Sequence, residues 1–198
     1  MPLKRRPMSQ KQTVLLVALL NVTYFVVEFA AAVSIASVSL FADSIDFLED
    51  ASVNLLIFAA LGWTARRRAQ VGMLLALILL IPSLAALWTA FEKLWNLTPP
   101  EPSTLSLVGI GALVVNATCA LLLARHRHMS GSLMKAAFLS ARNDVLANIA
   151  IMAAGPVTLW TASALPDLLV GLGILVMNGD AAVKVYKTAY REARETKV

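Results

Sequence analysis

Apolar runs long enough to cross a lipid bilayer recur along almost the whole chain. A helix needs about 20 residues to span a hydrocarbon core of ~30 Å, and 59% of the 198 residues are hydrophobic, compared with about 45–50% in soluble domains. This pattern predicts an all-α membrane protein, a six-transmembrane-helix bundle with little chain left over for a soluble domain. The predicted spans are residues 13–37, 39–63, 70–92, 104–124, 133–156 and 165–186.

Basic residues gather at one end of these predicted spans. If the spans alternate in direction, 15 of the 17 Lys and Arg residues lie on the side of the two termini. They are Lys4, Arg5, Arg6, Lys11, Arg66, Arg67, Arg68, Arg125, Arg127, Lys135, Lys184, Lys187, Arg191, Arg194 and Lys197. Cytoplasmic loops of membrane proteins carry such an excess. We therefore predict that both termini are cytoplasmic, and that the net charge of +5 reflects topology rather than nucleic-acid binding.

The spans divide the chain into three parts. Residues 1–12 form a basic cytoplasmic lead, residues 13–186 the helix bundle, and residues 187–198 a short basic cytoplasmic tail. The apolar run after the lead is longer than the apolar region of a signal peptide and has no clear A-x-A cleavage site, so we expect it to remain as the first span. These features predict an integral, multi-pass protein of the cell membrane, either a plasma membrane or a bacterial inner membrane.

Residues 42–50, ADSIDFLED, place four carboxylates inside the predicted second span. At ~100° per residue, Asp43 and Asp50 lie ~60° and ~40° to one side of Asp46, and Glu49 lies ~60° to the other, so one helix face carries all four. Acids within a membrane usually face a bundle interior or an aqueous cavity and mark an ion path, and a divalent cation would neutralise them together. The alternative is an outer loop with solvated acids, which would leave about 13 residues for the span, too few to cross.

A second polar cluster occurs in the predicted fifth span. Ser140, Asp144 and Asn148 recur at steps of four and share one helix face, and Asn143 lies ~60° from Ser140. The second and fifth spans run antiparallel in this topology, and both clusters fall near mid-span. A lone Asp in a membrane can simply bond to a neighbouring helix, but two clusters at one depth favour ion binding.

Short motifs with a characteristic order and spacing occur in five of the six predicted spans. They are Asn21-x-x-Tyr24-Phe25-x-x-Glu28, SVSLFADSIDFLED, VGIGALVVNATCALLL with Asn116, GSLMKAAFLSARND, and Asp167 at the start of the last span. Together they resemble the transmembrane part of the cation diffusion facilitator family, which exports zinc, cobalt, cadmium, iron or manganese in exchange for protons. The resemblance implies a proton-coupled cation efflux antiporter with six spans that works as a homodimer.

The resemblance also implies a set of metal ligands, because that family takes two residues four apart from the second span and two from the fifth. It places these pairs on Asp46 and Asp50, and on Ser140 and Asp144. A neutral serine hydroxyl is a poor zinc ligand, so the implied site has three carboxylates, completed by a water molecule or by the Asn143 carbonyl. This leaves cobalt, manganese and iron open beside zinc.

Other polar residues within the spans are predicted to support the site or the path to it. They are Asp43, Glu49, Glu28, Asn21, Asn148 and Arg142. Arg142 points ~200° away from Ser140, and we predict that it pairs with Glu49 or Glu28. Glu28 and Asn21 share one face of the first span, and simple packing between helices is an equal alternative for these two.

The sequence favours transport over catalysis. Both histidines lie in one predicted cytoplasmic loop and the spans contain no Ser–His pair, so we expect no enzyme and no cofactor beyond the transported cation. The expected partners are a divalent metal ion, protons, the lipid bilayer and a second copy of the chain. The alternative is a non-transporting membrane subunit that acts by helix association, favoured by Ser140 and by the lack of a cytoplasmic domain after the last span, whereas Asp46, Asp50 and Asp144 favour transport.

Overall fold

The computed structural model describes residues 8–60, 84, 86–126 and 131–177 of the chain. Within these ranges the regular structure is helical and contains no strand, which confirms the predicted all-α fold. The long helices are α1 (Gln10–Ile35), α2 (Val38–Ala60), α4 (Pro102–Ala124) and α5 (Gly131–Thr161). Two shorter helices cover residues 86–95 and Leu165–Met177.

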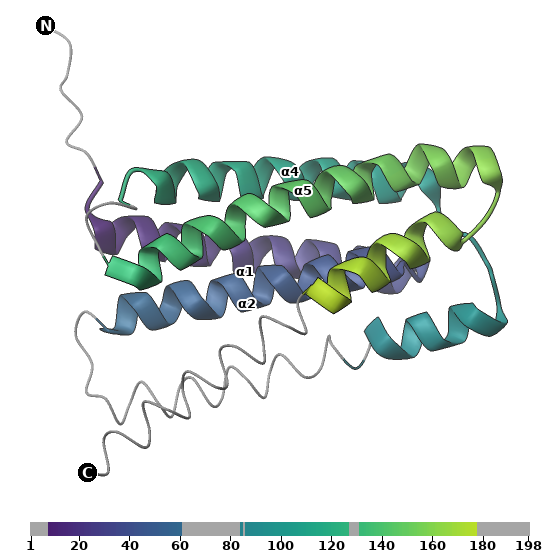
Figure 1. The fold of residues 1–198 in the computed structure, drawn as a ribbon, viewed down its shortest axis with the longest axis horizontal. Helices are drawn as coiled ribbons and strands as arrows, with labels where there is room; N and C mark the ends of the chain where they lie inside the picture. Colours follow the sequence, from purple (N-terminus) through teal and green to yellow (C-terminus); the bar gives the residue numbers. More distant parts are fainter. Residues whose placement is uncertain (1–7, 61–83, 85, 127–130, 178–198) are drawn as a thin grey trace, which may run out of the picture.

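The four long helices lie side by side and form one bundle (Figure 1). α1 packs chiefly against α2, and α4 against α5, while α1 also contacts α4 and α2 contacts α5. α2 and α4 touch as well, so the inward faces of the four helices meet along the middle of the bundle. Helix Leu165–Met177 lies beside the first half of α2, the half that carries the acidic stretch (Figure 1).

The outer surface of this bundle is apolar. Three helices are long and apolar enough to cross a membrane, namely Gln10–Ile35, Pro102–Ala124 and the Ser140–Thr161 part of α5. Their exposed side chains include Leu19, Val26, Leu107, Leu121 and Trp160. Exposed apolar residues of this number would be costly in water and are expected where helices face lipid. The chain is thus an integral membrane protein.

The predicted spans agree with the helices except at their ends. α5 reaches Thr161, beyond the predicted end at residue 156, because Pro156 is accommodated inside the helix. Lipid-buried helices tolerate an internal proline when neighbouring groups satisfy the freed carbonyl. Most of the predicted third span (70–92) and the end of the sixth (178–186) lie outside the described residues.

Helix α1 begins and ends at well-defined caps. Ser9 and Gln12 form a capping box, in which the Ser9 hydroxyl accepts from the Gln12 backbone N–H and the Gln12 side chain accepts from the Ser9 backbone N–H. At the other end, Ala36 adopts the left-handed conformation with φ of 49°. This residue reverses the chain within two residues, so α2 returns directly along α1.

The first turn of α2 is held by a carboxylate from another helix. Asp167, on helix Leu165–Met177, accepts from the hydroxyls of Ser37 and Ser39 at 2.6 Å each and from the backbone N–H groups of Val38 at 2.9 Å and Ser39 at 3.1 Å. Lys93 donates to the same carboxylate from residues 86–95 at 2.8 Å. We call these five residues the Asp167 cluster. It joins three helices and fixes the position of α2 along its axis.

Candidate metal centre

The acidic stretch of α2 is helical and lies inside the bundle. Asp43, Asp46 and Asp50 are 0%, 7% and 4% exposed, and Glu49 is half-buried. The alternative of an outer loop is therefore wrong. α2 begins at Val38, before the acids, so the whole stretch lies within the helix.

Two of the predicted site residues are joined directly across the bundle. The Ser140 hydroxyl of α5 donates to Asp50 Oδ1 of α2 at 2.9 Å, while Asp50 Oδ2 has no hydrogen-bond partner among the described residues. Asp144, one turn further along α5, is half-buried and interacts electrostatically with Asp50 and Asp46. The polar faces of α2 and α5 thus meet at one depth.

The described side chains do not form a complete set of metal ligands. No group of three or more His, Cys, Asp or Glu residues in the described ranges is close enough together to hold a metal. Ser140 acts here as a donor to Asp50, and Asn143 is exposed. The ligand set of Asp46, Asp50, Asp144, Ser140 and Asn143 remains a prediction.

The predicted ion pair of Arg142 is not present. Arg142 is exposed, and the described part of the chain contains no ion pair between it and Glu28 or Glu49. The reason is its position on the helix, because a residue ~200° from Ser140 points away from the face that meets α2. Glu49 is half-buried, and its carboxylate forms no ion pair with Arg142.

A second polar layer lies next to this centre and connects three helices. Asn116 of α4 donates its amide to Asn148 Oδ1 at 3.1 Å. Asn148 of α5 in turn donates to both carboxylate oxygens of Asp43 on α2, at 2.8 and 2.7 Å. All three side chains are almost completely buried. Asn148 was predicted to support the site, whereas Asn116 was not, although a single amide within an apolar span is a signal that could have identified it.

Helix α1 completes the polar layer. Asn21 and Glu28 are fully buried, and the Cys119 thiol of α4 donates to Asn21 Oδ1 at 3.6 Å. The Tyr24 hydroxyl, between them in sequence, donates to the Val108 carbonyl at 2.5 Å. These contacts fix α1 against α4. They also place the Glu28 side chain within the bundle, toward α2.

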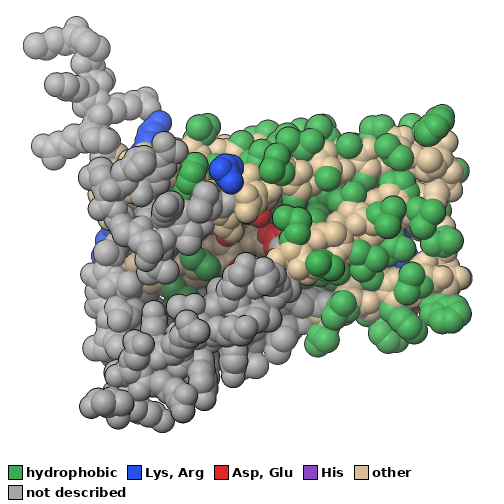
Figure 2. Space-filling model, in the orientation of Figure 1, with side chains coloured by type: hydrophobic (Ala, Val, Ile, Leu, Met, Phe, Trp, Pro, Cys, Tyr) green, Lys and Arg blue, Asp and Glu red, His purple; other side chains and the backbone are tan. Residues whose placement is uncertain are grey.

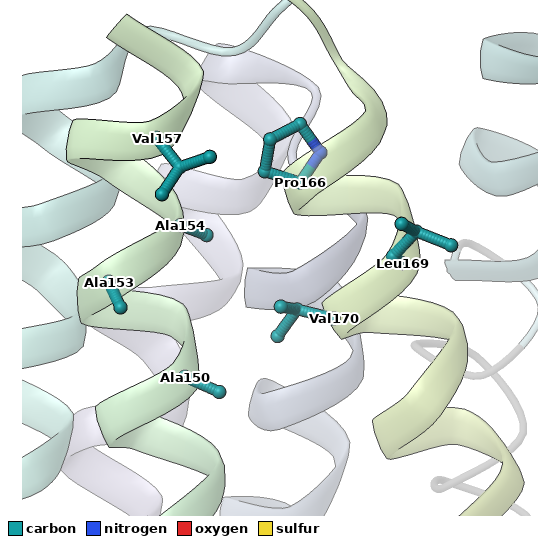
Figure 3. A pocket seen from close by; sticks show the side chains of 7 residues that line it. All are labelled: Ala150, Ala153, Ala154, Val157, Pro166, Leu169 and Val170. Atoms are coloured by element: carbon teal, nitrogen blue, oxygen red, sulfur yellow. The ribbon is translucent and has the colours of Figure 1, made fainter. Parts of the chain in front are cut away.

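The surface of the molecule shows acidic atoms and a separate apolar groove. A few acidic atoms are visible from the outside, with apolar side chains on the neighbouring surface (Figure 2). A groove between α5 and helix Leu165–Met177 is lined only by apolar side chains and offers no metal ligand (Figure 3). Its lining residues are Ala150, Ala153, Ala154, Val157, Pro166, Leu169 and Val170. The groove is therefore not the ion site.

An apolar helix bundle with buried carboxylates and amides between its helices defines an integral membrane protein with a polar interior. A sequence model of the cation efflux transmembrane domain matches residues 14–192. The chain therefore belongs to the cation efflux family, which confirms the resemblance, and its members are transporters of metal cations. No curated protein matches the chain.

Proposed function

We propose that the protein exports a divalent transition-metal ion in exchange for protons, and that Asp46, Asp50 and Asp144 bind the ion. The observation that carries the proposal is the contact of α2 with α5 at Ser140 and Asp50, next to Asp144. Ionised carboxylates buried without enough donors are costly, so a chain that keeps them inside a membrane neutralises them with protons or with a cation. A dication supplies that charge directly.

The ligands select the kind of ion. Three carboxylates and one hydroxyl form an oxygen-rich set, which suits manganese, cobalt or iron as well as zinc or cadmium. A serine hydroxyl contributes little to tetrahedral zinc binding. We therefore expect a broader metal preference and weaker zinc binding than a site with histidine at position 140 would give.

Transport requires the ion to be released on the other side. Ligands bind metal only when deprotonated, so protons compete with the ion for the carboxylates. An inward proton gradient would then drive export, a direction that the resemblance to the efflux family implies and that the charge distribution does not set. We further propose that the protein works as a homodimer in the cell membrane.

A flux assay tests this proposal. Purified protein is reconstituted into liposomes with an imposed pH gradient, and uptake of Mn²⁺, Co²⁺, Zn²⁺ and Cd²⁺ is measured in parallel. Asp46→Ala and Asp144→Ala should each reduce uptake at least about 100-fold, since the loss of a residue that only supports a ligand already costs roughly 10–100-fold. Glu92→Ala removes an exposed carboxylate and serves as the matched control.

The outcomes separate transport from the rival function. Uptake that persists in Asp46→Ala and Asp144→Ala would reject the assigned ligands. The absence of flux for every metal in the wild-type protein would instead favour a non-transporting subunit, a role consistent with the use of the Ser140 hydroxyl as a donor to Asp50.

A further inference from the structure

Glu28 is a fully buried acid that receives no hydrogen bond. Its side chain is 0% exposed, and no described group donates to Oε1 or Oε2; the side chain that it meets is the carboxyl of Asp43. A buried ionised carboxylate in this condition would lose several kcal/mol relative to water. The residue therefore either carries a proton or lies next to a cation.

The group that Glu28 faces is another carboxylate. Glu28 interacts electrostatically with Asp43, and more weakly with Asp46, both on α2. On its own helix the nearest titratable group is Tyr24, and from α5 Asp144 acts on Asp43. The described residues provide no lysine or arginine in an ion pair with Glu28. Its charged surroundings are thus negative on every side that the structure describes.

The hydrogen bonds around Asp43 decide which acid is ionised. Asn116 holds the oxygen of the Asn148 amide, so the Asn148 nitrogen must point at Asp43, where it donates to both oxygens. This donation from one nitrogen to both oxygens supports a charged Asp43 carboxylate. Glu28 receives no such donation. Two neighbouring buried carboxyls share one proton rather than ionise together, and here the asymmetry assigns that proton to Glu28.

We propose that Glu28 carries a proton shared with Asp43, and that this proton leaves when a dication binds among Asp46, Asp50 and Asp144. The inference rests on the proposed function and extends it, because the proton site is separate from the metal ligands. The O–H bond of the Glu28 carboxyl breaks, the proton passes to water, and the resulting negative charge is balanced by the bound ion. Asp43 couples the two events, since it interacts electrostatically with both Glu28 and Asp50.

The position of the pair suits this role. In the predicted topology Asp43 is nearer than Asp50 to the outer end of α2, and Asn148 is nearer than Asp144 to the outer end of α5. A proton arriving from the outside would therefore reach Glu28 and Asp43 before the metal ligands. A proton bound there would lower the affinity for the ion without protonating any of the metal ligands.

The experiment counts protons released per ion bound. Full-length protein in detergent is titrated with Mn²⁺ by calorimetry in buffers of different ionisation enthalpy, at one fixed pH. Glu28→Gln keeps the size of the side chain but has no proton to release, so the count should fall by as much as about one while Mn²⁺ still binds. Glu28→Asp retains a carboxyl and should restore part of the release. Glu92→Gln, the same change at an exposed position, should leave the count unaltered.

Each result distinguishes the two proposals. If Glu28→Gln binds Mn²⁺ and releases as many protons as the wild type, the proton site is wrong and the metal site stands. If the wild-type protein binds no dication at all, the proposed function fails first and this inference fails with it. Should Glu28→Gln not fold, Glu28→Met also removes the carboxyl at a similar side-chain length and must show the same deficit; an unchanged count in that variant overturns the inference.

Discussion

Asp167 and Glu28 are both fully buried acids in the same bundle, yet their surroundings are opposite. Asp167 accepts four hydrogen bonds from the start of α2 and one from the Lys93 ammonium. Glu28 accepts none among the described residues. The comparison separates two uses of a buried charge: a fully satisfied carboxylate holds helices together, whereas an unsatisfied one is available to a proton or an ion.

The same contrast applies along α2 itself. Its first turn is fixed by the Asp167 cluster, and Gly171 lets helix Leu165–Met177 approach closely, since a Cβ there would lie 2.7 Å from Ser39 N. About one and three turns later, Asp43 and Asp50 face α5. A rigid attachment at the beginning of the helix therefore sets the depth at which its acids are presented, which is what a binding centre requires.

The largest effect is expected from removing the cation that pairs with the buried Asp167 carboxylate. Lys93→Met leaves the Asp167 carboxylate buried without its cation and should lower the free energy of unfolding by about 3 kcal/mol, the lower part of the range for broken buried pairs because four neutral donors remain. Unfolding in detergent by denaturant titration measures it. Mn²⁺ binding by the folded fraction should be retained.

A double-mutant cycle gives the control for Lys93. Asp167→Asn alone should also destabilise the protein, but combined with Lys93→Met it should cost less than the sum of the two, with a coupling of roughly 0.5–3 kcal/mol. Additive losses would show that the ion pair does not hold the three helices together. Asp167 would then no longer differ from Glu28 by stabilising the packing of the helices.

A smaller effect is expected at Asp50, where one carboxylate oxygen accepts a hydrogen bond and the other accepts none among the described residues. Ser140→Ala removes the donor to Asp50 Oδ1 and should lower the free energy of unfolding of the metal-free protein by about 1 kcal/mol. If Ser140 only supports Asp50, Mn²⁺ affinity should fall no more than roughly 100-fold, as for a partner of a ligand. Both quantities are measurable by denaturant titration and calorimetry.

The control for Ser140 is a serine on the facing helix. Ser52 is buried and donates only to the Leu48 carbonyl, one turn back in its own helix, so Ser52→Ala should change neither stability nor affinity appreciably. A loss of Mn²⁺ binding well beyond roughly 100-fold in Ser140→Ala, with Ser52→Ala unaffected, would instead make the Ser140 oxygen a direct ligand.

Sequence reasoning predicted the contact between the polar faces of α2 and α5 better than it predicted the Asp167 cluster. The depth of Asp46 and Asp50, and their meeting with Ser140 and Asp144, follow from helical spacing and an antiparallel topology, which are local properties. The pairing of Lys93 with Asp167 depends on contacts between segments 74 positions apart. Nothing in the local pattern distinguishes these two charges from solvated loop residues, so they could be assigned only to the outer side.

Polar side chains without periodicity were equally hard to interpret. Asn116 is a single amide in an apolar span, and its importance comes from Asn148, which it orients toward Asp43. Arg142 shows the reverse error: a charge within a span suggested an ion pair, but its angular position leaves it exposed. In both cases the deciding information is which helix lies opposite, and a single sequence does not contain it.

The smallest effect is expected at a satisfied carboxylate outside the membrane. Glu101 caps α4, accepting from the Ser103 backbone N–H at 3.1 Å, the Thr104 backbone N–H at 2.5 Å and the Ser103 hydroxyl. These bonds, with that of the Ser103 hydroxyl first, lower the pKa of Glu101 from its ordinary value of 4.5 to about 2. Because Glu101 is fully exposed, water screens much of this contribution.

The sign of the pH dependence then follows from linkage. Since the pKa of Glu101 is lower in the folded protein, its stabilisation is complete above about pH 4.5 and is lost as the pH falls toward about 2. Glu101→Ala should therefore unfold at a slightly lower temperature than the wild type at pH 6, and the difference should shrink as the solution is acidified. Glu92→Ala, another exposed acid, provides the baseline. If the difference in unfolding temperature stays constant between pH 6 and 3, the cap does not depend on the charge of Glu101. Hydrogen bonds to a carboxylate would then stabilise this protein only where water is excluded, as at Asp167.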